Sequence, residues 1–210
     1  MDEDGSEEIG GDFGGGARVE PPGQYHSPIM RLFTGIGLPE EMAGKLEALI
    51  RELKPAAKLR WSPGANLHIT TKFIGEWPEE RLEELKRALR GVERRGALEI
   101  GVRGLGWFPN PHSPRIFWVS VEGGDGLRAL AAGTEAALAP LGIAREKRAY
   151  TPHLTLARVG PGTDLRELRR RVAELPGQDW GRFRAEWFSL YLSEPGAGGS
   201  VYTALERFAL

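Results

Sequence analysis

The sequence contains no cysteine in its 210 residues. A chain without thiols has no disulfide framework, no thiolate nucleophile and no zinc site of the cysteine type. It also lacks an apolar run long enough to span a bilayer, and its N-terminus lacks the charged-then-apolar pattern of a secretory signal. We therefore expect a cytoplasmic protein that does not contact a membrane, and thiol redox chemistry is excluded.

Histidine is scarce as well, with four residues. His26 lies near the N-terminus, and His112 lies in the loop sequence PNPHSP, where a solvated loop residue is the expected role. The other two, His68 and His153, are 85 positions apart, which gives no ligand spacing for a metal ion. We expect neither a metal nor another cofactor.

An excess of charge of either sign is absent overall, because the net charge is −1. The acids are nevertheless unevenly placed. Residues 1–28 hold seven acids and one base, which leaves 22 acids and 27 bases for residues 29–210. The mildly basic body favours an anionic partner such as a nucleic acid or nucleotide, although surplus arginine is also common on solvated helix faces.

The composition divides the chain into two parts. Residues 1–28 are rich in glycine and acids and poor in apolar side chains, so we predict a disordered extension. Met30 opens the first strand-like run, so an alternative is that the natural chain starts there. With 40% hydrophobic and 27% charged residues in the whole chain, residues 29–210 suit a single globular domain.

Strand-like and helix-like segments alternate along this domain. The expected strands are 29–36, 67–75, 98–102, 115–121, 152–159, 183–192 and 201–208. The expected helices begin near Leu38, Trp77, Gly126 and Asp164. The order of elements is similar in the two halves, so we predict a duplicated, two-lobed α+β fold. Two antiparallel sheets would face a central cleft, with the helices packed outside.

Two of the expected strands carry the same His-x-Thr motif, LHITTKFIG at 67–75 and PHLTLARV at 152–159. Side chains alternate along a strand, so His68 and Thr70 share one face, as do His153 and Thr155. The residue between them is apolar in both strands, and its burial would fix the register. Two matched pairs of this kind predict a site.

Paired histidines suit phosphoryl transfer. One neutral imidazole takes a proton from water while one imidazolium gives a proton to a leaving oxygen. In-line attack places the entering and leaving oxygens on opposite sides of phosphorus, and one histidine from each lobe supplies the two sides. The hydroxyls of Thr70 and Thr155 can donate to the non-bridging phosphate oxygens. A strained cyclic phosphodiester needs no metal in such a site.

On these residues, the chain from 29 to 210 resembles the two-histidine phosphoesterases, and within them the bacterial and archaeal RNA 2′,3′-cyclic phosphodiesterases, also called 2′-5′ RNA ligases. The likeness rests on the segments MRLFTGIGLPEE, RW, NLHITTKFIGE, PRIFWVSV, TPHLTLARV and SLYLSEPGAGGSVYTALERFAL. One departure is Thr71, where the family more often has leucine. It lies on the face expected to pack inward, where its hydroxyl would bond a nearby carbonyl.

The resemblance implies hydrolysis of RNA or nucleoside 2′,3′-cyclic phosphate to a 2′-phosphate. In the family's assignment, His68 protonates the departing 3′ oxygen, His153 activates the water, and Thr70 and Thr155 hold the phosphate. The expected partners are RNA with 2′,3′-cyclic phosphate ends or cyclic nucleotides, bound by a monomer. Three alternatives stay open: reversible 2′-5′ ligation of RNA, another nucleotide diester as substrate, and a non-catalytic module that binds nucleotides or RNA.

Two basic residues of the motifs match basic positions of the family. Arg158 would contact phosphate, but strict alternation from His153 puts it on the opposite face, so either the strand bends or Arg158 is structural. Lys72 shares the face of His68 by alternation, as a phosphate ligand or as a solvated lysine.

Aromatic residues near the motifs have two possible roles. Phe33, Trp61 and Tyr150 can stack on a base or belong to the core.

Overall fold

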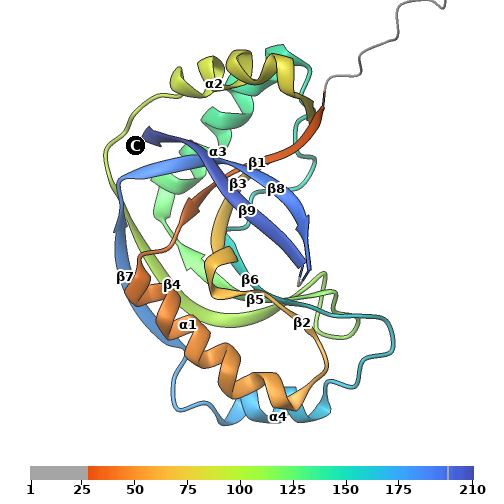
Figure 1. Cartoon of the computed structure of the whole chain (residues 1–210). Helices are drawn as coiled ribbons and strands as arrows, with labels where there is room; N and C mark the ends of the chain where they lie inside the picture. Colours follow the sequence, from red (N-terminus) through yellow and green to blue (C-terminus); the bar gives the residue numbers. More distant parts are fainter. Residues whose placement is uncertain (1–27, 198) are drawn as a thin grey trace, which may run out of the picture.

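The computed structural model describes residues 28–197 and 199–210 (Figure 1). The predicted disordered extension lies outside the described residues, apart from Pro28. The strands are β1 (Ile29–Gly37), β2 (Arg60–Trp61), β3 (His68–Pro78), β4 (Leu98–Phe108), β5 (Ile116–Glu122), β6 (His153–Arg158), β7 (Asp179–Ala185), β8 (Trp187–Gly196) and β9 (Gly199–Ala209). The α-helices of this part of the chain are α1 (Glu40–Leu53), α2 (Leu82–Arg90), α3 (Gly124–Leu138) and α4 (Arg166–Glu174).

The strands form one curled antiparallel sheet in the order β7-β4-β5-β6-β3-β1-β8-β9, and β2 pairs with β6. The two halves of this sheet repeat one arrangement: from the centre outward they read β6-β5-β4-β7 and β3-β1-β8-β9. They meet where Ile69 of β3 pairs with Leu154 of β6. The predicted α+β class and the duplication are confirmed, and the expected pair of sheets is joined into one through this contact.

The helices cover the outer side of the sheet in two groups. Figure 1 shows α2 and α3 together at one end of the molecule, and α1 and α4 at the other. Each amphipathic helix buries its apolar stripe; in α1 the buried residues are Met42, Leu46, Leu49, Ile50 and Leu53, at helical spacing. Ile69 and Leu154 are fully buried between the sheet and the helices. Their burial fixes the register between β3 and β6, because a shift of one residue would expose them.

Several element boundaries differ from the prediction. β3 continues to Pro78, so the helix expected to begin near Trp77 begins as α2 at Leu82. The expected strand 183–192 is two strands, β7 and β8, with Glu186 between them, because the first pairs with β4 and the second with β1 and β9. The expected strand 98–102 continues as β4 to Phe108. Gly104 has a φ of 77°, and the pairing with β5 shifts between Val102 and Leu105. A glycine that suggests a loop in the sequence therefore forms a bulge within a longer strand.

Candidate active site

A β-bulge follows the His-x-Thr motif in both β3 and β6. In β3, Thr70 pairs with Gly35 and Lys72 pairs with Thr34, so Thr71 is the extra residue. In β6, Leu156 is extra in the same way, between the paired residues Thr155 and Ala157. A bulge places two successive residues on one side of the strand and reverses the alternation after it.

The bulge in β6 turns Arg158 onto the same face as His153 and Thr155. Leu156 and Ala157 are both fully buried, and Arg158 is exposed. The sequence left two possibilities for Arg158, a bend in the strand or a structural role on the opposite face. The structure has the bend. We call the face of the sheet that carries His68, Thr70, His153 and Thr155 the site face.

The bulge in β3 has the opposite effect on Lys72. Its side chain is 2% exposed, and its ammonium donates to Glu135 Oε1 at 2.6 Å and to the Ala144 carbonyl at 2.7 Å. The expectation that Lys72 shares the face of His68 is therefore wrong, because the bulge turns it toward α3. Phe73, which strict alternation from the apolar Ile69 would place on the inward face, takes the position on the site face and is 61% exposed.

The inward position of Thr71 is confirmed. Its side chain is buried, and its hydroxyl shares a hydrogen bond of 2.8 Å with the hydroxyl of Thr34 rather than with a carbonyl.

The antiparallel register brings the two motifs together. Ile69 is paired with Leu154, and the strands are antiparallel. The residue before Ile69 therefore lies opposite the residue after Leu154, and the residue after Ile69 lies opposite the residue before Leu154. His68 therefore lies across from Thr155, and Thr70 lies across from His153, all on one face. Arg158, four residues beyond Leu154, lies on the His68 side of this arrangement.

Both imidazole rings are oriented by the same contact. His68 Nδ1 lies 2.7 Å from the Asn66 carbonyl, and His153 Nδ1 lies 2.8 Å from the Thr151 carbonyl. A carbonyl only accepts, so Nδ1 carries the proton in both rings and Nε2 is the basic nitrogen. His68 Nε2 lies 3.0 Å from Thr70 Oγ1, which can donate to it.

The surroundings lower the pKa of both histidines. Burial lowers the pKa of His68 to about 4, with smaller contributions from the positive charges of His153 and Arg158, against the opposing hydrogen bond to Asn66. Burial also lowers the pKa of His153, against the hydrogen bond to Thr151. Both rings are therefore neutral at pH 7 in the free protein. A bound anion would favour the protonated form of either ring.

Aromatic rings surround His68. Its ring lies 4.6 Å from Phe33 and 5.1 Å from Tyr202, measured between centroids, and Tyr191 stacks on Phe33 at 5.1 Å. Next to this cluster, residue 35 must be glycine, because a β-carbon there would lie 2.7 Å from the Ile69 carbonyl oxygen. Phe33 is itself buried, at 4% exposure, so of its two possible roles it has the one in the core, where it packs against the His68 ring. The sequence prediction missed both tyrosines.

The corresponding aromatic residues beside His153 are Phe108 and Trp118, at 5.0 and 6.3 Å between ring centroids. The other two aromatic residues singled out in the sequence have structural contacts. Trp61 packs edge-on against buried Phe117 at 6.1 Å. The hydroxyl of half-buried Tyr150 donates to the Thr70 carbonyl at 2.9 Å and so holds the loop before His153 against β3.

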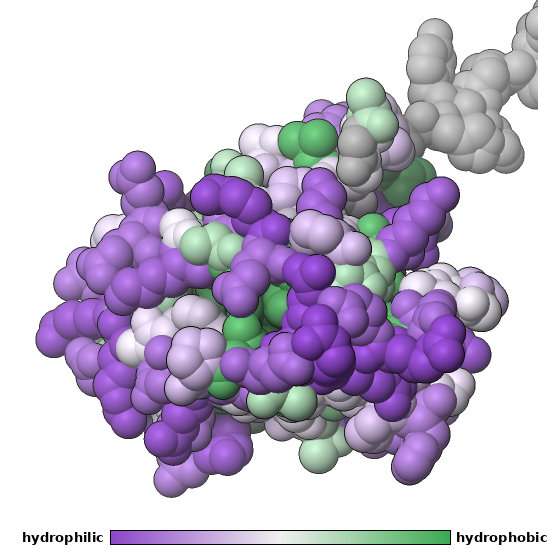
Figure 2. Space-filling view, turned by 90° about the horizontal axis from the view of Figure 1, so that it is seen from below, coloured by the Kyte–Doolittle hydropathy of each residue, from purple (hydrophilic) through white to green (hydrophobic). Residues whose placement is uncertain are grey.

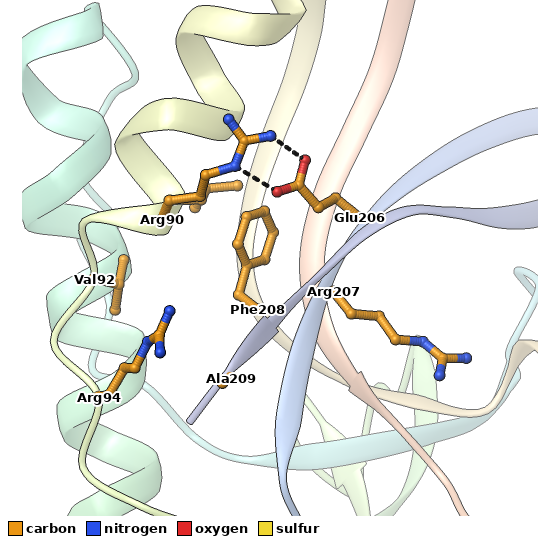
Figure 3. A pocket seen from close by; sticks show the side chains of 8 residues that line it. Arg90, Val92, Arg94, Glu206, Arg207, Phe208 and Ala209 are labelled. Carbon is orange, nitrogen blue, oxygen red and sulfur yellow. Dashed lines mark hydrogen bonds and ion pairs between the residues drawn. The ribbon is translucent and has the colours of Figure 1, made fainter.

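A separate hollow lies between the end of α2 and the last residues of β9 (Figure 3). At its edge, Arg90 donates two hydrogen bonds to the Glu206 carboxylate, at 2.7 and 2.8 Å, and Phe208 lies beside them. Neither His-x-Thr pair lines this hollow. It belongs to the packing of α2 on β9, and the site face remains the candidate active site.

Metal binding and membrane crossing find no support in the described residues. They contain no group of three or more histidine, cysteine or acidic side chains placed to hold a metal ion. None of their helices combines the length and the apolar character that a membrane crossing requires.

Comparison with known proteins identifies the family. The sequence model described as LigT like Phosphoesterase matches residues 36–118 and then 119–202. The chain belongs to the LigT-like phosphoesterase family. The two matches are consecutive, with His68 in the first and His153 in the second, in agreement with the duplication seen in the sheet. The expected family is confirmed, and with it the expectation of an enzyme.

Relatives of this LigT-like chain cover nearly all of the domain. An RNA 2′,3′-cyclic phosphodiesterase of Methanothermobacter thermautotrophicus is 32% identical over 86% of this chain and 99% of its own length. The crystal structure of TT0787 of Thermus thermophilus has a TM-score of 0.71 at 32% identity, covering 86% of this chain and 98% of that one. The structure of E. coli LigT complexed with 3′-AMP has a TM-score of 0.70 at 28% identity, covering 87% and 99%.

Proposed function

We propose that this chain hydrolyses RNA or nucleoside 2′,3′-cyclic phosphates to 2′-phosphates without a metal, with His68 and His153 as general acid and base. The observation that carries the proposal is the crosswise placement of the two His-x-Thr pairs about the Ile69 and Leu154 contact. The names of the relatives, RNA 2′,3′-cyclic phosphodiesterases, support the choice of substrate.

The reaction is a single in-line displacement. His153 Nε2 takes a proton from a water molecule whose oxygen forms the new bond to phosphorus. The bond from phosphorus to the 3′ oxygen breaks on the opposite side, and protonated His68 gives its Nε2 proton to that oxygen. The 2′ ester bond stays intact, so the product is a 2′-phosphate.

The remaining side chains of the site face bind the phosphate. The hydroxyls of Thr70 and Thr155 donate to the non-bridging oxygens, where negative charge develops. Arg158 supplies a positive charge and planar donors on the His68 side, which suit a phosphate. Burial and the positive charges of His153 and Arg158 lower the pKa of His68. His68 therefore takes up its proton together with the anionic substrate, and the resulting imidazolium is a strong acid.

The test is hydrolysis of 2′,3′-cyclic AMP in excess EDTA by wild type, His68→Ala and His153→Ala, with the phosphate position in the product identified. We expect the wild type to form the 2′-phosphate and each variant to lose at least the ~100-fold that a general acid or base contributes. An inert wild type, a requirement for metal, or variants as active as wild type would overturn the proposal.

A further inference from the structure

Two arginines oppose each other at the edge of the site face. Arg60 of β2 is the paired residue of Arg158 in β6, and the next residue, Trp61, pairs with Ala157. Directly opposed residues of an antiparallel pair share one face, with Cβ atoms about 5 Å apart. Trp61 packs into the core against Phe117, so Arg60 points the other way, onto the site face beside Arg158.

This placement is unfavourable for the protein alone. Like charges directly opposite each other destabilise a strand pair. Both arginines are exposed, and within residues 28–197 and 199–210 neither forms an ion pair. The β2 segment is nevertheless fixed, since the Ser62 hydroxyl donates to the Thr155 carbonyl at 2.8 Å and the Ser62 amide to the Leu156 carbonyl, also at 2.8 Å.

Some arginines elsewhere on the surface are paired with acids of the chain. In α4, Arg170 is hydrogen-bonded to the carboxylates of both Glu167 and Glu174, at distances from 2.7 to 2.9 Å. That helix lies on the mostly hydrophilic side of the molecule that Figure 2 shows from below. Arg60 and Arg158 differ from such pairs because they oppose each other directly and no acidic side chain of the described residues lies between them, so the site face favours an anion at this point.

The position of Arg60 indicates which anion. It lies level with Arg158, on the order of 13 Å along the strand from Leu154 at the centre of the site. The positive charge of Arg158 acts on His68, so its long side chain extends back toward this centre, whereas Arg60 is not among the charges that act on His68. The reacting phosphate is already surrounded at that centre. In the proposed reaction His68 protonates the 3′ oxygen, so the ribose lies on the His68 side. The chain of an RNA substrate leaves through the 5′ oxygen of that ribose, toward Arg60.

We propose that Arg60 binds the internucleotide phosphate next to the terminal, cyclised nucleotide, while Arg158 contacts the reacting phosphate. The inference rests on the proposed function and deepens it. It makes an RNA end of two or more nucleotides the better substrate, because a cyclic mononucleotide has no phosphate at this position. The guanidinium group suits the role, since its planar donors match two oxygens of a phosphate.

The experiment compares kcat/KM of Arg60→Gln and wild type on two substrates, 2′,3′-cyclic AMP and a trinucleotide RNA ending in a 2′,3′-cyclic phosphate. On the RNA we expect about a tenfold loss, mostly in KM, as for one charge-assisted phosphate contact. The loss on the mononucleotide is expected to be at least five times smaller. Arg51→Gln, the same charge change on an exposed position of α1, serves as the control and leaves both values unchanged.

Salt dependence gives an independent readout. The slope of log kcat/KM against log salt for the RNA should be shallower by about 0.7 in Arg60→Gln, the value for one phosphate contact to a single strand. Equal losses on both substrates, or no loss on the RNA, would overturn the role of Arg60. If Arg60→Gln does not fold, the wild type decides: equal salt slopes for the two substrates overturn the inference.

Failure of the proposed function is distinguishable from these outcomes. In that case the wild type turns over neither substrate. Fluorescence anisotropy with the trinucleotide RNA carrying a terminal 2′-phosphate then tests Arg60 by binding alone. Affinity that is the same in wild type and Arg60→Gln would reject the proposed contact.

Discussion

The segments 68–73 of β3 and 153–158 of β6 have the same local backbone structure, but they place different side chains on the two faces of the sheet. Both begin His-x-Thr, and both have a bulge at the fourth residue. At the fifth and sixth positions the first has Lys72 and Phe73, and the second has Ala157 and Arg158. The bulge in β3 turns Lys72 into the interior, where it bonds Glu135 of α3. The bulge in β6 turns Arg158 onto the site face. The two His-x-Thr pairs are symmetric, and their surroundings are not.

The largest expected difference between the two halves concerns acid stability. The pKa of His68 in the folded protein is lowered to about 4 from its ordinary value of 6.5, which the unfolded chain keeps. Between these pH values the unfolded state binds a proton that the folded state does not, so stability falls as the pH drops through this window. The loss attributable to His68 is on the order of 3 kcal/mol.

Urea unfolding at pH 7 and at pH 4 measures this effect. His68→Gln should remove most of the pH-dependent loss, and His153→Gln should remove a smaller part, because the pKa of His153 is lowered less. An equal contribution from both histidines would contradict the difference in environment between the halves.

Substitutions at the sixth position of the two segments, Phe73 in β3 and Arg158 in β6, are expected to differ in their effect on catalysis. Arg158→Met removes a charge-assisted contact worth about 2 kcal/mol, so we expect a loss in kcat/KM of about 30-fold. Phe73→Met at the matching position of β3 keeps an apolar side chain and should lose far less. Steady-state kinetics on 2′,3′-cyclic AMP measure both. Comparable losses would mean that Arg158 has no special part in binding phosphate.

The fifth positions differ in their effect on stability. Lys72→Met leaves the Glu135 carboxylate without its ammonium partner, and we expect a loss of about 2 kcal/mol in the free energy of unfolding. The double variant Lys72→Met with Glu135→Leu should recover part of it. A double-mutant cycle by urea unfolding checks this. Additive losses in the two single variants would show that the pair is not coupled.

The smallest effect is expected at the bulge of β3. The hydroxyls of Thr34 and Thr71 bond each other in the core, where the other half has the apolar pair Phe117 and Leu156. Replacing either threonine by valine leaves one buried hydroxyl without its partner, at a cost of about 1 kcal/mol. The double valine variant should be close to wild type in thermal unfolding. A double variant less stable than both singles would contradict this view of the bulge.

Much of the fold and the motif is predictable from the sequence, because both depend on local patterns. Alternating strands and helices predict the α+β class, and the spacing of two in His-x-Thr predicts that each pair shares a face. The bulges are not predictable in this way, since they depend on the residues of the neighbouring strands. For this reason alternation misplaces Lys72 and Phe73 and leaves Arg158 undecided.

The surroundings of the histidines are hidden from the sequence for a similar reason. Tyr191 and Tyr202 come from β8 and β9, more than a hundred residues after His68. They reach it only because β8 pairs with β1. The opposition of Arg60 and Arg158 likewise requires the pairing of β2 with β6, and a strand of two residues has no pattern that would predict its partner.

A change of leaving group tests the division of acid and base between the two histidines. A 2′,3′-cyclic nucleotide with sulfur in place of the 3′ oxygen expels a thiolate, which needs little help from an acid. We predict that His68→Ala recovers most of its lost activity on this substrate, while His153→Ala stays as impaired as on the oxygen substrate. Recovery by His153→Ala instead, or by neither variant, would contradict the assignment of His68 as the acid and His153 as the base.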